Sequence, residues 1–125
     1  MREIRFRAWI KGENRMSNRV NVYSDGSFAC AEMGEVTSIP DGILMQYTGL
    51  KDKNGREIYE GDIVKLSNAS YLTNYKVRFG GGQWECYTPD DGRGDPNTEE
   101  LYGWNYHGWV TVIGNIYENP ELWEP

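Results

Sequence analysis

Histidine and cysteine are scarce in this 125-residue chain, which has one histidine, His107, and two cysteines, Cys30 and Cys86. A metal site that needs two histidines cannot form within one subunit, and the two cysteines lack the clustered spacing of a zinc site. They are also too few for a disulfide framework. We therefore expect free thiols, no metal site and no cofactor.

Long apolar runs are also missing. No stretch approaches the ~20 apolar residues needed to cross a bilayer. The basic, polar start lacks the hydrophobic region of a signal peptide. We expect a protein without membrane contact, made and retained in the cytoplasm.

Positive charge is in short supply, since 13 basic residues face 19 acidic ones and the net charge is −6. Non-specific nucleic-acid binding depends on a basic surface, so a nucleic-acid partner is possible but disfavoured. The charge is also uneven. Residues 1–20 hold six basic and two acidic residues, a net of +4, whereas residues 88–125 hold one basic and eight acidic residues, a net of −7. The two ends can attract each other within or between subunits, or both can be ordinary solvated surfaces.

Glycine and aromatic residues, by contrast, are abundant. The chain has 15 glycines, five tryptophans and nine tyrosines, a composition that favours many short strands, tight turns and a core containing large rings. Its length suits one domain. We predict a mainly β fold built around a small barrel, with residues 1–44 as an N-terminal β-rich part and residues 45–125 as the barrel part.

Alternating apolar and polar residues predict the strands. Ile4, Phe6 and Ala8 alternate with Arg5, Arg7 and Trp9, which indicates a strand with one buried face. Two hairpins are expected: residues 20–23 with 28–31 through a two-residue Asp25-Gly26 loop, and residues 75–79 with 83–87 through the glycines at 80–82. Further extended segments are expected at 36–39, 43–47, 63–66 and 109–117, with a bulge or bend at Gly114.

Turn signals divide these strands. Asn54-Gly55 and Gly61-Asp62 predict two reversals before Ile63, and Pro40-Asp41-Gly42 predicts another. The acidic segment 88–100 shows no periodicity and is predicted to be a loop. Asn119 as a cap and Pro120 at the first position predict one C-terminal helical turn, with Leu122 folded back on the barrel.

Three blocks carry a family resemblance: the opening MREIRFRAWI, the central MQYTGLKDKNGREIYEGDIVKL at 45–66, and the closing VIGNIYENPELWE at 112–124. In this order they resemble the signature blocks of the YopX-like family of phage and prophage proteins. The resemblance implies a small phage-encoded protein of a bacterial host with an SH3-like β-barrel, which self-associates and has no established activity. It brings no catalytic residues.

Candidate sites are few. His107 is expected to be structural or on the surface, and pairing with Cys30 or Cys86 as a nucleophile would need them to meet in space. The acidic segment 90–100 lacks the spacing of an EF-hand loop. Trp84, Tyr87, Trp104, Tyr106 and Trp109 form the best candidate for a binding surface. These rings suit core packing, a subunit contact or the stacking of unpaired bases.

We therefore expect a non-enzymatic, self-associating interaction module that contacts other copies, or a host or phage protein. The alternative is a single-stranded nucleic-acid-binding accessory protein of phage replication, using the N-terminal arginines and the aromatic residues.

Overall fold

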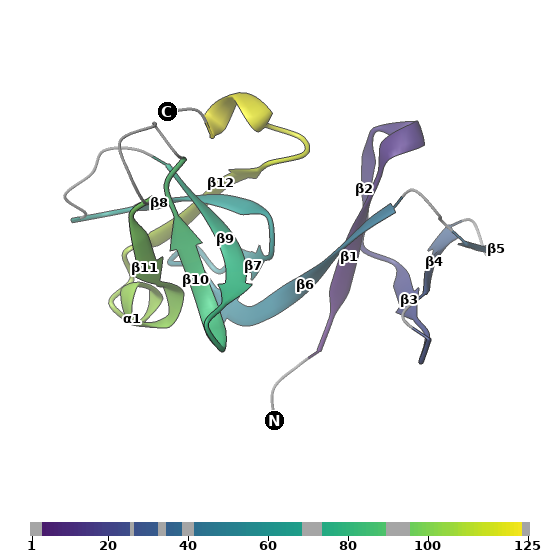
Figure 1. The fold of residues 1–125 in the computed structure, drawn as a ribbon, viewed down its shortest axis with the longest axis horizontal. Coiled ribbons are helices and arrows are strands. Elements are labelled where there is room, and N and C mark those ends of the chain that lie inside the picture. Colours follow the sequence, from purple (N-terminus) through teal and green to yellow (C-terminus); the bar gives the residue numbers. More distant parts are fainter. Residues whose placement is uncertain are drawn as a thin grey trace. The chain divides into compact units, whose positions relative to one another are not determined.

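The computed structural model describes residues 4–25, 27–32, 35–38, 42–68, 74–89 and 96–123, and the chain divides into two compact units at residues 1–47 and 48–125 (Figure 1). A mainly β fold is confirmed, since every strand pairing in the described residues is antiparallel and α1 is the one α-helix among them. A single domain over the whole chain stays a prediction.

The first unit contains a three-stranded sheet and most of a four-stranded sheet in the order β2-β1-β6-β7, whose last strand, β7, belongs to the second unit. Its elements are β1 (Phe6–Ile10), η1 (Lys11–Glu13), β2 (Arg15–Ser17), β3 (Val20–Val22), β4 (Phe28–Glu32), β5 (Glu35–Ser38) and the first part of β6 (Gly42–Lys51). β1 lies between β2 and β6, and β3, β4 and β5 pair in sequence order as a meander, as expected. The core of this unit consists of Ala8, Ile10 and Cys30, with Val20 and Phe28 packed against them.

The one-sided burial predicted for the first strand is wrong. Arg7 and Trp9 are buried as well as Ala8 and Ile10, and Ile4 is exposed. β1 is an inner strand, paired with β2 on one side and β6 on the other, and side chains cover both of its faces. Alternation in the sequence does not reveal whether polar side chains will also be covered.

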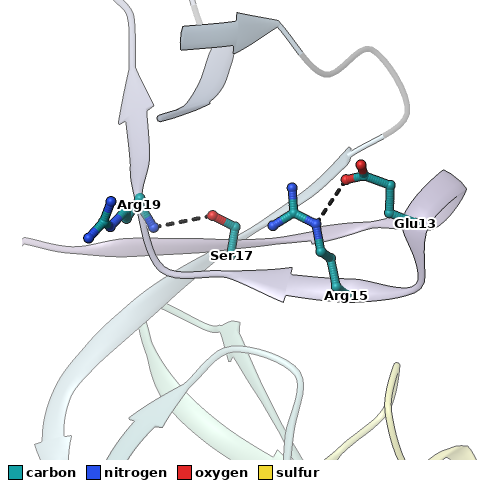
Figure 2. Close-up of polar contacts among 4 residues, drawn as sticks. All are labelled: Glu13, Arg15, Ser17 and Arg19. Atoms are coloured by element: carbon teal, nitrogen blue, oxygen red, sulfur yellow. Dashed lines mark hydrogen bonds and ion pairs between the residues drawn. The ribbon is translucent and has the colours of Figure 1, made fainter. Parts of the chain in front are cut away.

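The turn between β1 and β2 is held by short-range polar contacts (Figure 2). Asn14 takes a left-handed conformation (φ 48°) after η1, which asparagine tolerates better than most residues. Arg15 Nε donates to Glu13 Oε2 at 2.9 Å, and the Arg19 backbone N–H donates to Ser17 Oγ at 3.3 Å. The Arg15–Glu13 contact lies at the turn between β1 and β2, and the Arg19–Ser17 contact lies between β2 and β3.

The hairpin between β3 and β4 forms, but the two-residue loop predicted for it is wrong. Val22 pairs with Phe28, and the Tyr23 N–H donates to the Ser27 carbonyl, so three residues form the loop. Asp25 Oδ1 accepts bonds from the Ser27 hydroxyl and N–H, which lower the pKa of the Asp25 carboxyl. Gly26 and the predicted turn residues Pro40 and Asp41 lie outside the described residues.

The second unit is an antiparallel sheet with a short helix. Its elements are the end of β6, β7 (Glu57–Tyr59), β8 (Asp62–Leu66), β9 (Tyr75–Gly80), β10 (Gln83–Tyr87), β11 (Thr98–Glu100), α1 (Leu101–Tyr106), β12 (Val110–Asn115) and η2 (Pro120–Leu122). Five strands form one sheet in the order β11-β10-β9-β8-β12, which Figure 1 shows curling beside α1.

The turn between β6 and β7 is organised by the buried carboxylate of Asp52. Asp52 Oδ1 accepts the N–H groups of Asn54 and Arg56, each at 2.9 Å, while Oδ2 accepts the Val112 N–H at 2.9 Å. Gly55 takes φ 83°, which confirms the predicted reversal. One side chain thus closes the turn and ties it to β12.

The second predicted turn and the glycine hairpin also form. Gly61 has φ 85°, and Asp62 Oδ2 accepts the Tyr59 N–H at 2.8 Å. Between β9 and β10, Gly81 and Gly82 both have positive φ, as a two-residue type I′ loop requires. Trp84 and Cys86 point into the core, as their alternation predicts.

The core of the second unit is larger than that of the first. Its buried members come from β7, β8, β9, β10, α1 and β12: Ile58, Val64, Leu66, Tyr75, Val77, Trp84, Cys86, Leu101, Val110 and Val112. Leu50 and Trp104 are half-buried against this cluster. The core therefore anchors α1 through Leu101 and leaves its other side open.

The loop predicted for 88–100 is partly wrong, because Thr98–Glu100 forms β11 and pairs with β10. The helix α1 was not predicted. β11 has three residues and α1 has six. Elements this short are stabilised by packing on the sheet edge, and the local sequence does not reveal that packing. Residues 90–95 of the acidic segment lie outside the described residues.

The C-terminal turn forms as predicted, although its cap differs. Gly114 lies at a register shift between β12 and β8, which confirms the bulge. Asn119 precedes η2, but its side chain accepts the Asn115 N–H at 3.3 Å instead of capping the helix. Leu122 lies against Gly114, and its carbonyl accepts a bond from Asn74 Nδ2 at 2.7 Å.

Among the described residues, no helix has the length and apolar character that crossing a membrane requires.

Candidate functional site

The five aromatic residues predicted to form one surface lie in three different environments. Trp84 is 9% exposed and belongs to the core, where its ring packs edge-on against Phe79 with centroids 5.1 Å apart. Tyr87 lies in a second group with Trp123. Trp104, Tyr106 and Trp109 come together in the third.

The group around Tyr87 is closed by contacts within the chain. The Tyr87 and Trp123 rings pack edge-on at 5.4 Å. Arg78 Cζ lies 3.8 Å from the Tyr87 centroid, and Lys76 Nζ lies 4.0 Å from that of Trp123. Arg78 also pairs with Glu85 at 2.7 Å. These rings hold the C-terminal turn on the sheet and are half-buried.

The third group is built by α1 and the turn after it. Leu101 is buried in the core, and the helix rises from there with Tyr102 and Tyr106 one turn apart on its outer side. Gly108 takes φ 74°, and the Trp109 N–H donates to the Trp104 carbonyl at 3.2 Å. The reversal returns Trp109 to the side of the helix.

Five rings then form an unbroken series of contacts. Trp104 packs edge-on with Trp109 at 5.4 Å, Trp109 stacks with His107 at 4.5 Å, His107 meets Tyr106 at 5.5 Å, and Tyr106 stacks with Tyr102 at 6.3 Å. Tyr102 is 60% exposed and Tyr106 is 75% exposed. We call these five residues the ring surface.

Charged residues flank the ring surface on both sides. Glu99 and Glu100 immediately precede α1, and Glu99 Oε2 accepts a bond from Trp104 Nε1 at 3.1 Å. At the far end, Asn105 Nδ2 donates to the Lys51 carbonyl at 2.8 Å, and the Lys53 N–H donates to the Val110 carbonyl at 3.2 Å. Lys51 and Lys53 are exposed.

Sequence reasoning did not assign Tyr102 and His107 to the ring surface, and it did not place Lys51 and Lys53 near α1 and β12. Tyr102 could have been found from its spacing of four residues to Tyr106, together with the Leu101 and Trp104 spacing of three, because both are helical. No sequence signal points to Lys51 and Lys53, because Lys51 lies 54 positions before Asn105 of α1 and Lys53 is far in sequence from its partner Val110 of β12.

Cys86 is unsuited to act as a reactive thiolate. Both cysteines are buried and unbridged. Burial raises the pKa of the Cys86 thiol to about 12, with smaller contributions from the negative charges of Glu99 and Glu85. A thiol with such a pKa stays protonated at neutral pH, and the thiolate is the nucleophilic form. His107 is exposed and stacked on Trp109.

The described residues contain no group of three histidine, cysteine or acidic side chains that could hold a metal ion. What they do offer is exposed ring area with fixed geometry. Tyrosine and tryptophan anchor protein contacts well, because they bury a large area at a small cost in conformational freedom.

Comparison with protein families shows the family to which the chain belongs. The family model described as YopX protein matches residues 5–124. The chain belongs to the YopX family. The resemblance seen in the three sequence blocks is therefore confirmed.

Two solved structures share the YopX-family fold with this chain. Protein EF1440 from Enterococcus faecalis is 27% identical with a TM-score of 0.67, and protein yopX from Bacillus subtilis is 24% identical with a TM-score of 0.63. In both cases 99% of this chain and 100% of the other are covered. Comparison with curated proteins gives no significant match.

Proposed function

We propose that this YopX-family member is a phage- or prophage-encoded, non-enzymatic interaction module that self-associates through the ring surface. The observation that carries the proposal is the exposure of Tyr102 and Tyr106 at one end of a series of five contacting rings. Burying such rings releases water from apolar area without ordering flexible side chains, since neighbouring rings already hold them.

The fold and location that accompany this function are also proposals. We infer that the second unit is an SH3-like barrel, supported by its curled five-stranded antiparallel sheet. We also infer that the protein acts in the cytoplasm of a bacterial host. This inference is supported by the resemblance of the chain to a family of phage and prophage proteins. Another copy of the chain is the principal partner, and a host or phage protein is a further one.

Light scattering coupled to size exclusion tests self-association. At tens of micromolar the wild type should have a mass that is a multiple of 14.4 kDa, whereas a Tyr102→Ser, Tyr106→Ser variant should approach the mass of one chain. Tyr23→Ser is a matched control, because Tyr23 is 48% exposed but lies on the first unit. A wild type that is monomeric at these concentrations contradicts the proposal.

A second candidate function, binding of single-stranded nucleic acid, is favoured by one observation. The Lys51 and Lys53 backbones bond to Asn105 of α1 and to Val110, which follows Trp109, and base stacking near phosphate-binding cations is the usual arrangement of such sites. The second unit opposes this with seven basic against thirteen acidic residues. Fluorescence anisotropy with labelled single-stranded DNA at low salt tests whether the protein binds it. An unchanged anisotropy on adding the protein would contradict this second candidate function.

A further inference from the structure

The ring surface has opposite charges at its two ends. Glu99 and Glu100 lie where α1 begins, and the Glu100 carboxylate lies alongside Gly103 of the helix. Lys51 lies where the helix ends, since Asn105, the residue before the last of α1, bonds to its carbonyl at 2.8 Å. The helix that joins these two ends carries the exposed rings of Tyr102 and Tyr106.

The spacing of the charges suits a pairing of the surface with itself. Six helical residues span about 9 Å at 1.5 Å per residue. In a two-fold contact the same patch faces itself in the opposite direction. The acidic end of one copy then meets the lysine end of the other, and the contact is made twice.

The net charge of the second unit favours the antiparallel approach of two copies over other approaches. Each second unit carries seven basic and thirteen acidic residues, a net of −6, so two copies repel each other in most approaches. At the ring surface an antiparallel approach brings lysines to carboxylates, whereas a parallel approach would bring like charges together.

We propose that the ring surface is a two-fold interface, in which Glu100 of each copy pairs with Lys51 of the partner subunit across packed Tyr102 and Tyr106 rings. The inference rests on the proposed self-association and adds its partner, its orientation and its charge pairs. It predicts that one surface supplies both halves of the contact.

Charge reversal tests the pairing. Lys51→Glu alone and Glu100→Lys alone should each weaken association by about tenfold or more in sedimentation velocity, because each places like charges together twice. An equimolar mixture of the two variants should regain wild-type affinity within about threefold, since both contacts in the mixed pair are again opposite in charge. The double variant on one chain should recover in the same way.

Lys11→Glu and Glu121→Lys are the matched controls, because they make the same charge changes at exposed residues that do not belong to the ring surface. Recovery in the mixture also shows that both variants are folded. If the wild type associates but the single variants associate equally well, or the mixture does not recover, the two-fold pairing is wrong while the proposed function stands. A wild type that never associates contradicts the proposed function itself.

Discussion

Single polar side chains fix the turns of the second unit. Asp52 is 6% exposed, and its two carboxylate oxygens accept three backbone N–H groups, two in its own turn and one from Val112 of β12. A charged acceptor strengthens each of these bonds relative to a neutral one. Asp52 therefore contributes to the stability of two segments that are far apart in sequence.

Replacing Asp52 tests this role. Asp52→Ala should lower the free energy of unfolding by about 2–4 kcal/mol, since the N–H groups lose their acceptor and Val112 is buried. Urea denaturation measures the change, and Lys53→Ala, at the exposed neighbouring position, should stay within about 0.5 kcal/mol of wild type. Equal stability of the two variants would contradict the role given to Asp52.

Cys86 makes stability depend on alkaline pH. Its pKa is about 12 in the folded chain against an ordinary value of 9.0. Between these values the unfolded thiol ionises and the folded one does not, so rising pH favours the unfolded chain. From pH 8 to pH 10 the wild type should lose about 1 kcal/mol more stability than Cys86→Ala. Parallel losses in urea denaturation at the two pH values would contradict the shift.

At the scale of elements, the C-terminal turn depends on a glycine. A Cβ at Gly114 would lie 2.5 Å from Asn119 Oδ1 and 3.0 Å from Leu122 Cδ1. Asn115 holds the turn closed, because its side-chain oxygen accepts the N–H groups of Tyr117 and Glu118. The bulge, the turn and η2 thus form one packed unit on β12.

Gly114→Ala should displace this turn and destabilise the fold by about 1–3 kcal/mol, as overpacking does. Near-ultraviolet circular dichroism should change as well, because Trp123 leaves Tyr87 and Lys76. Adding Asn119→Ala removes the nearest clashing atoms and should recover part of the loss. Gly12→Ala, which meets nothing within 4 Å, is the control. A double variant no better than the single one would contradict this account.

At the scale of the whole molecule, the two units differ in their cores. Among the described residues, the core cluster of contacting buried side chains has ten members in the second unit and three in the first. Regions with little apolar burial open at a lower free energy. Amide hydrogens of β1 to β4 should therefore exchange faster than those of β8, β9 and β10, measured by exchange and mass spectrometry. Equal protection of the two sets would contradict this expectation.

Local patterns were sufficient for much of the fold. Asn54-Gly55, Gly61-Asp62 and the glycines at 80–82 each form the predicted reversal, because a positive φ at glycine is a property of the residue itself. The hairpin of β9 and β10 followed from alternation, and Gly114 marked the bulge of β12. The prediction was wrong for β1, β11 and the β3–β4 loop, where pairing partners decide burial and register.

The binding surface was harder to predict than the fold. Three of the five proposed residues, Trp104, Tyr106 and Trp109, come together. Alternation in β10 already pointed to a core position for Trp84, but no sequence pattern separated Tyr87 from these three. All five are large rings in a chain rich in such rings. Whether a ring is exposed depends on the element that carries it and on what packs over that element.

The sequence alone determined the family, the mainly β character and the positions of the glycine turns, since these depend on residue order and on the conformations that each residue permits. Tertiary structure alone decided that α1 packs at the sheet edge, that its rings meet in series and that the Lys51 backbone bonds to Asn105 of that helix. The reason is physical: chain folding brings together residues more than 50 positions apart, and exposure and charge pairing exist only once those contacts form.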